Sequence, residues 1–212
     1  MHGLFITFEG IDGCGKSLQA KRLAGRLQKK GVQVQLFRDP GGPPISEKVR
    51  RILLDRDHGD MSAMTELLLY ESARAQLVDE WIRPALEKGD VVLCDRFTDS
   101  TLAYQGYGRG LDLDLVRRAN DLACRGIFPG LTVVLDIPVE ESLRRMAGMN
   151  KPADRMENQA REFFERVRRG FRQIAEAEPR RVRILDGLKS EEELEQVIFQ
   201  DVYPMIESAG HH

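Results

Sequence analysis

The chain has 212 residues, enough for one α/β domain with a buried core and too few for two domains of ordinary size. Its 32 Lys and Arg residues nearly balance 34 Asp and Glu residues, and the net charge of −2 argues against a general nucleic-acid-binding protein. No stretch reaches the roughly 18 apolar residues that a membrane helix needs, and three widely spaced cysteines predict neither a disulfide framework nor a zinc site. We therefore expect a cytoplasmic protein with a single domain over residues 1–212.

Short apolar runs alternate with longer amphipathic stretches along the chain. Five runs suit buried strands: Leu4–Glu9, Val32–Arg38, Val91–Asp95, Leu131–Asp136 and Val182–Asp186. Helical spacing of apolar residues marks Lys16–Lys30, Met61–Leu86 and Val139–Ala147. The alternation predicts an α/β fold, a doubly wound five-stranded parallel sheet with helices on both faces. Four of the runs end in an acidic residue, and ligands of such sheets bind beyond the carboxyl ends of the strands.

The first apolar run leads directly into a phosphate-binding pattern, G-x-x-x-x-G-K-[ST], and a helical pattern follows it. The pattern is filled by Gly10-Ile11-Asp12-Gly13-Cys14-Gly15-Lys16-Ser17. Glycines let successive N–H groups turn toward phosphate oxygens, and the following helix adds its positive N-terminal end. Lys16 would place a charge on the β- and γ-phosphates, and the Ser17 hydroxyl would ligate Mg²⁺. The eight residues therefore predict a site for a nucleoside triphosphate.

The loop alone does not separate a kinase from a nucleotide-driven switch. A GTPase would carry Asn-Lys-x-Asp after a strand, whereas Asn150-Lys151-Pro152-Ala153-Asp154 is one residue longer and follows a predicted helix. We favour a kinase on this ground. A kinase for another small acceptor and a nucleotide-gated regulator remain the alternatives.

Two further segments predict the acceptor side of the site. Asp95 ends the third strand where an acid helps to hold magnesium, and Arg96 beside it offers a planar fork for a phosphate. A structural Asp–Arg pair is the alternative. Tyr70 and Arg74 lie four residues apart on one helix face and suit a flat base, although an aromatic at this spacing also suits a core. Residues 100–108 are predicted to form a loop or helix start that lines the same crevice.

Four blocks of sequence together resemble bacterial thymidylate kinases over essentially the whole chain. They are Glu9–Ser17, Arg38-Asp39-Pro40-Gly41-Gly42, Asp95-Arg96-Phe97 and Ala103-Tyr104-Gln105-Gly106. The resemblance implies a P-loop nucleoside-monophosphate kinase that transfers the γ-phosphoryl group of ATP to dTMP with the help of Mg²⁺. It also implies a mobile lid and a homodimer.

The resemblance implies roles for residues around the nucleoside. Tyr70 would stack on thymine, and Arg74 would donate to its 4-oxo group. Thr101 and Gln105 would complete the contacts to the base edge. Tyr104 would press on the sugar where a ribose 2′-hydroxyl would lie.

Other implied roles concern the phosphates. Lys16 and Arg96 would be catalytic, and Arg38 would hold the acceptor phosphate together with Arg96. Asp12 would face the acceptor and a metal-bound water. Asp39 would lie at the sugar, where relatives more often carry the longer Glu.

The lid is expected at residues 144–157. Family members without an arginine in the phosphate loop usually bring arginines from the lid, and Asp12-Gly13-Cys14 contains none. Arg145, Lys151 and Arg155 are the candidates, and we predict catalytic roles for Arg145 and Arg155. The alternative is that these side chains pair with glutamates on a solvated surface, where such pairs contribute little.

Overall fold

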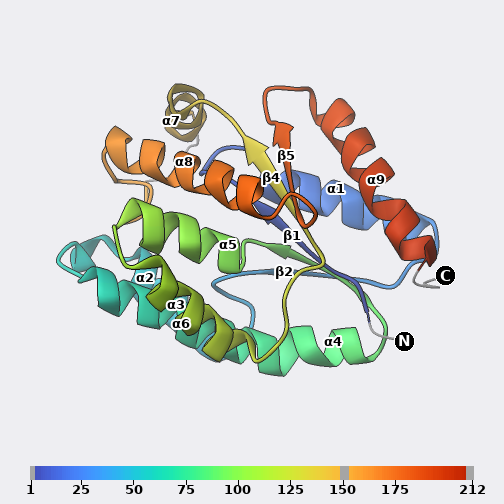
Figure 1. The fold of residues 1–212 in the computed structure, drawn as a ribbon, viewed down its shortest axis with the longest axis horizontal. Coiled ribbons are helices and arrows are strands. Elements are labelled where there is room, and N and C mark those ends of the chain that lie inside the picture. Colours follow the sequence, from blue (N-terminus) through green and yellow to red (C-terminus); the bar gives the residue numbers. More distant parts are fainter. Residues whose placement is uncertain (1–2, 149–152, 209–212) are drawn as a thin grey trace.

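The computed structural model describes residues 3–148 and 153–208, so the prediction for Lys151 lies outside the described residues. Five parallel strands form one sheet in the order β2-β3-β1-β4-β5 (Figure 1). The strands are β1 Phe5–Glu9, β2 Val34–Arg38, β3 Val91–Asp95, β4 Leu131–Asp136 and β5 Val182–Asp186. The predicted parallel sheet is confirmed, and three of its strands have the predicted bounds.

Helices surround the sheet. They are α1 Lys16–Lys29, α2 Pro44–Leu54, α3 Ala63–Leu77, α4 Arg83–Glu87, α5 Thr98–Thr101, α6 Leu113–Cys124, α7 Val139–Ala147, α8 Arg161–Ala177 and α9 Glu191–Ser208. Three further segments belong to other helix types. They are the 3-10 helix η1 Arg56–His58 and the π-helices η2 Val78–Ile82 and η3 Leu102–Gly108. Among the described residues, no helix combines the length and apolar character needed to cross a membrane.

The helical spacing over Met61–Leu86 is confirmed, but the helix is not regular along its length. The segment is α3, η2 and α4 in succession. Pro84 explains the interruption, because proline lacks an N–H group and its ring displaces the carbonyl group four residues before it. That carbonyl belongs to Glu80 in η2, and a π-helical turn accommodates the displacement.

Alternation of side chains along the strands produces the two buried faces of the sheet. Phe5 packs with Ile82 and other residues of the α3–α4 region. The next residue, Ile6, belongs to the core that includes Leu23 and Leu27 of α1. Figure 1 shows α1 and α9 together on one side of the sheet and α3 to α6 on the other.

The carboxyl ends of the central strands lie side by side. Asp95 of β3 is in register with Phe8 of β1 on one side and with Arg38 of β2 on the other. The segments that follow β1, β2 and β3 therefore meet at one edge of the sheet. This places the phosphate loop beside Arg38-Asp39 and Arg96, which are predicted to bind the acceptor.

Candidate active site

The phosphate loop has the backbone shape that its glycines predict. Gly10, Gly13 and Gly15 have φ angles of 131°, 74° and 96°, in the region that residues with a Cβ rarely adopt. A Cβ at Gly10 would lie 2.5 Å from the carbonyl oxygen of Leu135. Gly15 is the N-cap of α1, so the first amides of this helix face the loop.

Lys16 lies under the loop rather than in solvent. It is 6% exposed, and its Nζ donates to the carbonyl oxygen of Ile11 at 3.4 Å. The carboxylate of Asp12 lies 3.8 Å from the same nitrogen. The ammonium group is thus held against Ile11 and Asp12 of the loop.

Ser17 and Asp95, predicted as magnesium ligands, lie together. The Ser17 hydroxyl donates to Oδ2 of Asp95. Oδ1 of Asp95 is buried and has no hydrogen-bond partner among the described residues. A hydroxyl and a carboxylate with an unused oxygen fit Mg²⁺, which takes few protein ligands and fills its shell with water and phosphate. No group of three or more His, Cys, Asp and Glu side chains within residues 3–148 and 153–208 offers a denser site.

Arg96 joins the phosphate loop to the acceptor side. Its φ angle of 70° is unusual for a non-glycine residue, and such backbones occur at functional sites. Its Nη1 donates to the carbonyl oxygen of Gly10 at 3.1 Å and to Oγ of Ser100 at 2.9 Å. Its Nη2 donates to Asp12 at 2.6 Å and to the Tyr104 hydroxyl at 3.1 Å.

Asp12 is held as a carboxylate by its neighbours. The Tyr104 hydroxyl donates to its Oδ2 at 3.0 Å. Burial raises the pKa of Asp12, but the charges of Arg96 and Lys16 and this hydroxyl lower it more, so the pKa is about 2. Asp12 is therefore ionised at neutral pH and balances the guanidinium of Arg96.

Glu9 is a residue of the site's interior that the sequence analysis did not assign. Its carboxyl accepts from the backbone N–H of Phe97 at 2.7 Å and from the Ser100 hydroxyl at 2.5 Å. Burial, followed by the charge of Asp99, raises the pKa of Glu9 to about 8 against the opposing effect of Arg96. Its position at the start of the first resemblance block was the available signal.

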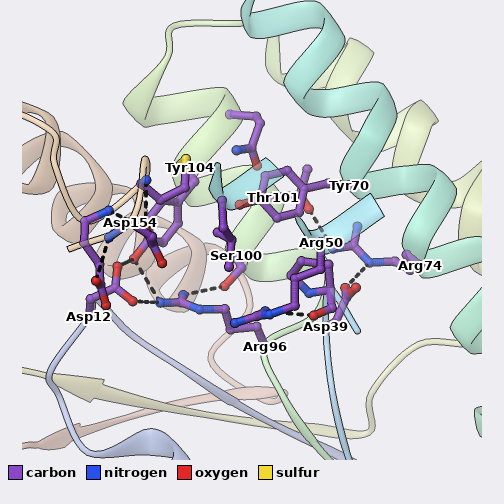
Figure 2. A pocket seen from close by; sticks show the side chains of 15 residues that line it. Asp12, Asp39, Arg50, Tyr70, Arg74, Arg96, Ser100, Thr101, Tyr104 and Asp154 are labelled. Carbon is purple, nitrogen blue, oxygen red and sulfur yellow. Dashed lines mark hydrogen bonds and ion pairs between the residues drawn. The ribbon is translucent and has the colours of Figure 1, made fainter. Parts of the chain in front are cut away.

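A pocket beside the phosphate loop brings together the residues predicted to bind the acceptor, with the exception of Arg38 (Figure 2). Its walls include Asp12, Asp39, Tyr70, Arg74, Arg96, Thr101, Tyr104 and Gln105. These residues come from α3, α5 and η3 as well as from the ends of β1, β2 and β3. The segment 100–108 is helical throughout, in α5 and η3, rather than a loop.

The structure does not bring Arg38 into this pocket. The Arg38 side chain is 52% exposed and donates to both carboxylate oxygens of Glu47, at 2.8 and 2.9 Å. It lines a separate open hollow next to Ser17. The turn that follows Arg38 explains its position, because the N–H of Gly42 donates to the same Glu47 carboxylate at 2.6 Å.

Arg50 lines the pocket and was missed. It lies on α2, one helical turn after Glu47, and donates to the carbonyl oxygen of Pro40 at 2.8 Å. Burial and then the charge of Arg38 lower the pKa of Arg50 below its usual range. Arg50 is one of several basic residues on an amphipathic helix and has no distinguishing pattern, so the sequence by itself did not identify it.

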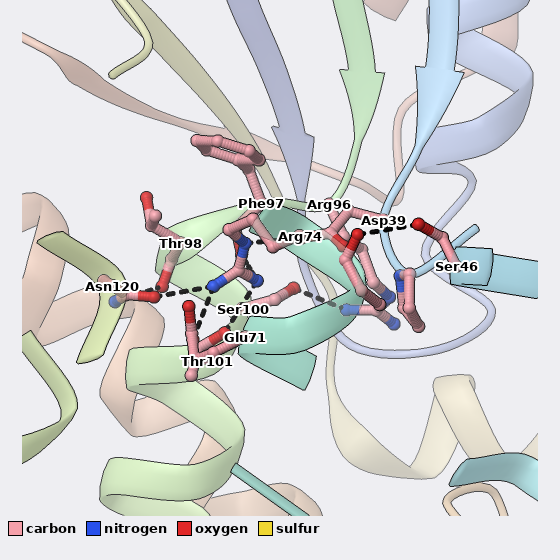
Figure 3. Close-up of polar contacts among 12 residues, drawn as sticks. Asp39, Ser46, Glu71, Arg74, Arg96, Phe97, Thr98, Ser100, Thr101 and Asn120 are labelled. Atoms are coloured by element: carbon pink, nitrogen blue, oxygen red, sulfur yellow. Dashed lines mark hydrogen bonds and ion pairs between the residues drawn. The ribbon is translucent and has the colours of Figure 1, made fainter. Parts of the chain in front are cut away.

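Arg74 is buried in the pocket wall with all five of its N–H groups engaged (Figure 3). The acceptors are Asp39 at 2.7 Å, Glu71 at 2.7 Å, Asn120 at 2.6 Å, the carbonyl oxygen of Phe97 at 3.2 Å and Oγ1 of Thr101 at 2.8 Å. A guanidinium has five donors, so the predicted donation to a base requires the exchange of one of these contacts. In this structure Arg74 holds together α3, α5, α6 and the end of β2.

The two lid arginines have different surroundings. Arg145 pairs with Glu141 at 2.6 Å, as the surface alternative predicts, but its Nη1 also lies 3.3 Å from the carbonyl oxygen of Gly13 in the phosphate loop. Arg155 is buried, donates to the carbonyl oxygen of Leu53 at 2.7 Å and pairs with Glu66 at 2.6 Å. These contacts of Arg155 are to α2 and α3 and not to the phosphate loop, so they favour Arg145 for contact with the transferred group.

The parallel sheet, the loop after its central strand and the adjoining pocket define a P-loop kinase fold. The sequence model of the family described as thymidylate kinase matches residues 8–198, and the chain belongs to the thymidylate kinase family. Thymidylate kinase of Pelotomaculum thermopropionicum is 48% identical over 191 residues, which are 90% of this chain and 88% of that protein. Thymidylate kinase of Geobacter sulfurreducens is 52% identical over 190 residues, which are 87% of this chain and 89% of that protein.

A solved structure shows the same fold. The crystal structure of thymidylate kinase from Ehrlichia chaffeensis superimposes with a TM-score of 0.77 at 33% identity. The match covers 95% of this chain and 99% of that chain. The family resemblance and the fold predicted from the sequence are thus confirmed.

Proposed function

We propose that this chain transfers the γ-phosphoryl group of ATP to dTMP, giving dTDP and ADP. The observation that supports this most is the pocket beside the phosphate loop, where Arg96 and Asp12 join the donor and acceptor sides through a 2.6 Å ion pair. We further propose that residues 1–212 form one kinase domain that acts in the cytoplasm and closes over its substrates with a lid at residues 144–157.

The donor side would bind the triphosphate of ATP. The loop amides and Lys16 would hold the β- and γ-phosphates, and phosphoryl transfer depends mainly on such positioning and charge neutralisation. Ser17 and Asp95 would hold Mg²⁺, which when bound neutralises phosphate charge. Arg145 is the lid residue that we propose for the charge developing on the transferred group, because it already lies at the loop.

The acceptor side would place dTMP with its phosphate toward Arg96. Arg96 and Arg50 line the same pocket, so we propose that Arg50 takes the role predicted for Arg38. A phosphate oxygen of dTMP would then face the γ-phosphorus in line. Tyr104, fixed by Arg96 and Asp12, would lie against the sugar and disfavour a ribose 2′-hydroxyl.

The base would lie in the deeper part of the pocket. Tyr70 would stack on thymine, and Gln105 and Thr101 would face its edge. Oδ1 of Asp39 is buried without a hydrogen-bond partner among the described residues, and we propose that it accepts from a sugar hydroxyl.

We also propose a homodimer, formed through the outer face of α2 and α3. Large apolar side chains are exposed there, namely Ile45 by 55%, Ile52 by 44%, Met64 by 40% and Leu68 by 58%. Several exposed large apolar side chains on two helices that pack together are typical of an interaction surface. Light scattering should show a dimer that Leu68→Glu dissociates, and a monomeric wild-type protein would contradict the proposal.

A coupled assay of ADP release tests the proposed activity. The acceptors are dTMP, dUMP, dCMP, dGMP, AMP and UMP, each offered with ATP and Mg²⁺. We expect rapid release of ADP with dTMP and with none of the other acceptors. Rapid release with a different acceptor would indicate another nucleotide kinase, and nucleotide-dependent binding of a partner without transfer to any acceptor would indicate a regulator.

A further inference from the structure

Glu66 is a buried carboxylate behind the pocket to which the sequence analysis gave no role. It lies in the first turn of α3 with its side chain out of contact with solvent. Its Oε1 accepts from Gln105 Nε2 at 2.9 Å and from Arg109 Nε at 3.0 Å. Its Oε2 accepts from Arg109 Nη2 at 2.9 Å and from Arg155 Nη1 at 2.6 Å. Two hydrogen bonds to each oxygen fill the acceptor capacity of a carboxylate.

The two arginines keep Glu66 ionised. Burial raises the pKa of this carboxyl, but the hydrogen bonds from Arg109 and Gln105, with the charges of Arg109 and Arg155, lower it below its ordinary value. An ionised carboxylate accepts hydrogen bonds and cannot donate. Every polar group that faces Glu66 must therefore be a donor.

This requirement fixes the direction of the Gln105 side chain. A glutamine amide has a donating NH₂ end and an accepting carbonyl end. The NH₂ end of Gln105 donates to Glu66. Gln105 also lines the pocket, together with Tyr70 and Thr101. The carbonyl oxygen of Gln105 is therefore the end of the amide that is available to a ligand in the pocket. Reversal of the amide would place two acceptor oxygens against each other in a buried site, which is unfavourable.

We propose that Glu66 is a specificity-determining residue that, through Gln105, selects a pyrimidine with a proton on N3. The inference rests on the proposed function, since it takes this pocket as the site of the acceptor base. Thymine carries the N3 proton and can donate it to the Gln105 carbonyl oxygen. Cytosine has an acceptor at N3, which would face that oxygen with no proton between them, and sites built around a buried hydrogen bond strongly reject a mismatched partner.

The test compares dTMP with 5-methyl-dCMP, which matches the methyl group of thymine and differs at N3 and at the 4-substituent. The ratio of kcat/KM for the two acceptors is measured in the wild-type protein and in Glu66→Gln. A glutamine at position 66 can accept or donate, so Gln105 becomes free to turn. We expect the preference for dTMP to fall at least about tenfold. An unchanged preference in a folded Glu66→Gln protein would overturn the proposal.

Two further variants separate the possible outcomes. Asp99→Asn is the matched control, because Asp99 is also a buried carboxylate, holds Arg181 at 2.7 and 2.8 Å, and lies outside the pocket walls. We expect it to keep the preference. Gln105→Leu tests the base contact itself. If the preference for dTMP over 5-methyl-dCMP is lost in Gln105→Leu but kept in Glu66→Gln, only the role of Glu66 is refuted. If the preference is kept in both variants, the proposed base site is refuted as well.

A measurement on the wild-type protein covers the case in which Glu66→Gln does not fold. The side-chain amide of Gln105 is observed by NMR in protein labelled with ¹⁵N-glutamine and bound to dTMP, and is identified by its absence in Gln105→Leu. We expect its protons to exchange slowly with solvent because Glu66 holds the NH₂ group. Rapid exchange would contradict the proposal.

Discussion

The phosphate loop and the acceptor pocket are built in opposite ways. The loop is eight consecutive residues whose backbone N–H groups we propose as the main binding groups, and its lysine makes one long hydrogen bond within the described residues. The pocket is made of side chains from distant segments, joined by buried contacts such as those of Arg74 with Asp39 and Glu71. We therefore expect ligand binding to be separable from folding in the loop, and the same side chains to serve both in the pocket. The experiments below test this difference.

The largest effect is expected from Lys16→Ala. Removal of a charge that acts on the transferring phosphates in a site poor in water should lower kcat by about a thousandfold. Because the ammonium group of Lys16 makes only one long hydrogen bond within the described part of the protein, thermal unfolding should change little. Lys29→Ala, on the exposed end of the same helix, is the control and should keep full activity. Retention of most of the kcat by Lys16→Ala would remove Lys16 from the mechanism.

Arg74→Ala should act on stability first, unlike the loop variant. Its loss leaves Asp39 and Glu71 buried without their shared partner, and such losses cost about 3 kcal/mol or more. Use of dTMP should fall far more than binding of ATP, because Asp39 and Thr101 line the acceptor pocket. Arg117→Ala, which breaks an exposed pair with Asp114, should have little effect on unfolding. Wild-type stability of Arg74→Ala would contradict the structural role of this residue.

The features that could be predicted from the sequence are those that a local residue pattern determines. The strands appeared as apolar runs and the loop as a contiguous motif, so the sheet and the position of Lys16 followed directly. Residue chemistry suggested Arg96, Tyr70 and Arg74 for the acceptor side, and the family resemblance added the others. The structure gathers all the predicted acceptor residues except Arg38 in one pocket. Sequence reasoning could not find that Glu47 holds Arg38 away, since that contact depends on how a glycine turn closes.

Buried ion pairs between segments that are distant in the sequence could not be predicted from the sequence either. The pairing of Arg155 with Glu66 joins residues 89 positions apart and depends on packing of the whole chain. Arg50 lies on an amphipathic helix among other basic residues, and Glu66 lies on the largely apolar helix α3, so no sequence pattern marks either residue. Only the three-dimensional arrangement shows that they line or support the pocket.

Arg145→Ala tests the lid more narrowly. If Arg145 reaches the transferring group on closure, its removal should lower kcat about 10- to 100-fold with little change in the KM for dTMP. Arg144→Ala is a matched control, because Arg144 is the adjacent residue and pairs with the same Glu141 from an exposed position. Arg155→Ala should instead raise the KM for dTMP, since Arg155 contacts Glu66. Equal kcat values for Arg145→Ala and Arg144→Ala would place the needed charge elsewhere.

A separate prediction concerns Glu9 and the dependence of stability on pH. Its pKa of about 8 in the folded protein exceeds the ordinary value of 4.5, so between these pH values the folded state holds a proton that the unfolded state has released. The stabilisation that this proton provides is complete below pH 4.5 and is lost as pH rises to 8, by at most about 1.4 kcal/mol for each pH unit. Glu9→Gln removes this titration. The free energy of unfolding is measured in urea at pH 5, 6.5 and 8. The stability of the wild-type protein should fall relative to that of Glu9→Gln as the pH rises. A difference between the two proteins that stays constant with pH would contradict the raised pKa of Glu9.

The most direct test of the account is a crystal structure with dTMP and a non-hydrolysable ATP analogue bound together. The central claim is that the loop and the pocket hold the two nucleotides on either side of Arg96 and Asp12. We expect the terminal phosphate of the analogue at Lys16, the phosphate of dTMP at Arg96, and thymine between Tyr70 and Gln105. A structure with thymine outside this pocket, or with the dTMP phosphate away from Arg96, would contradict it.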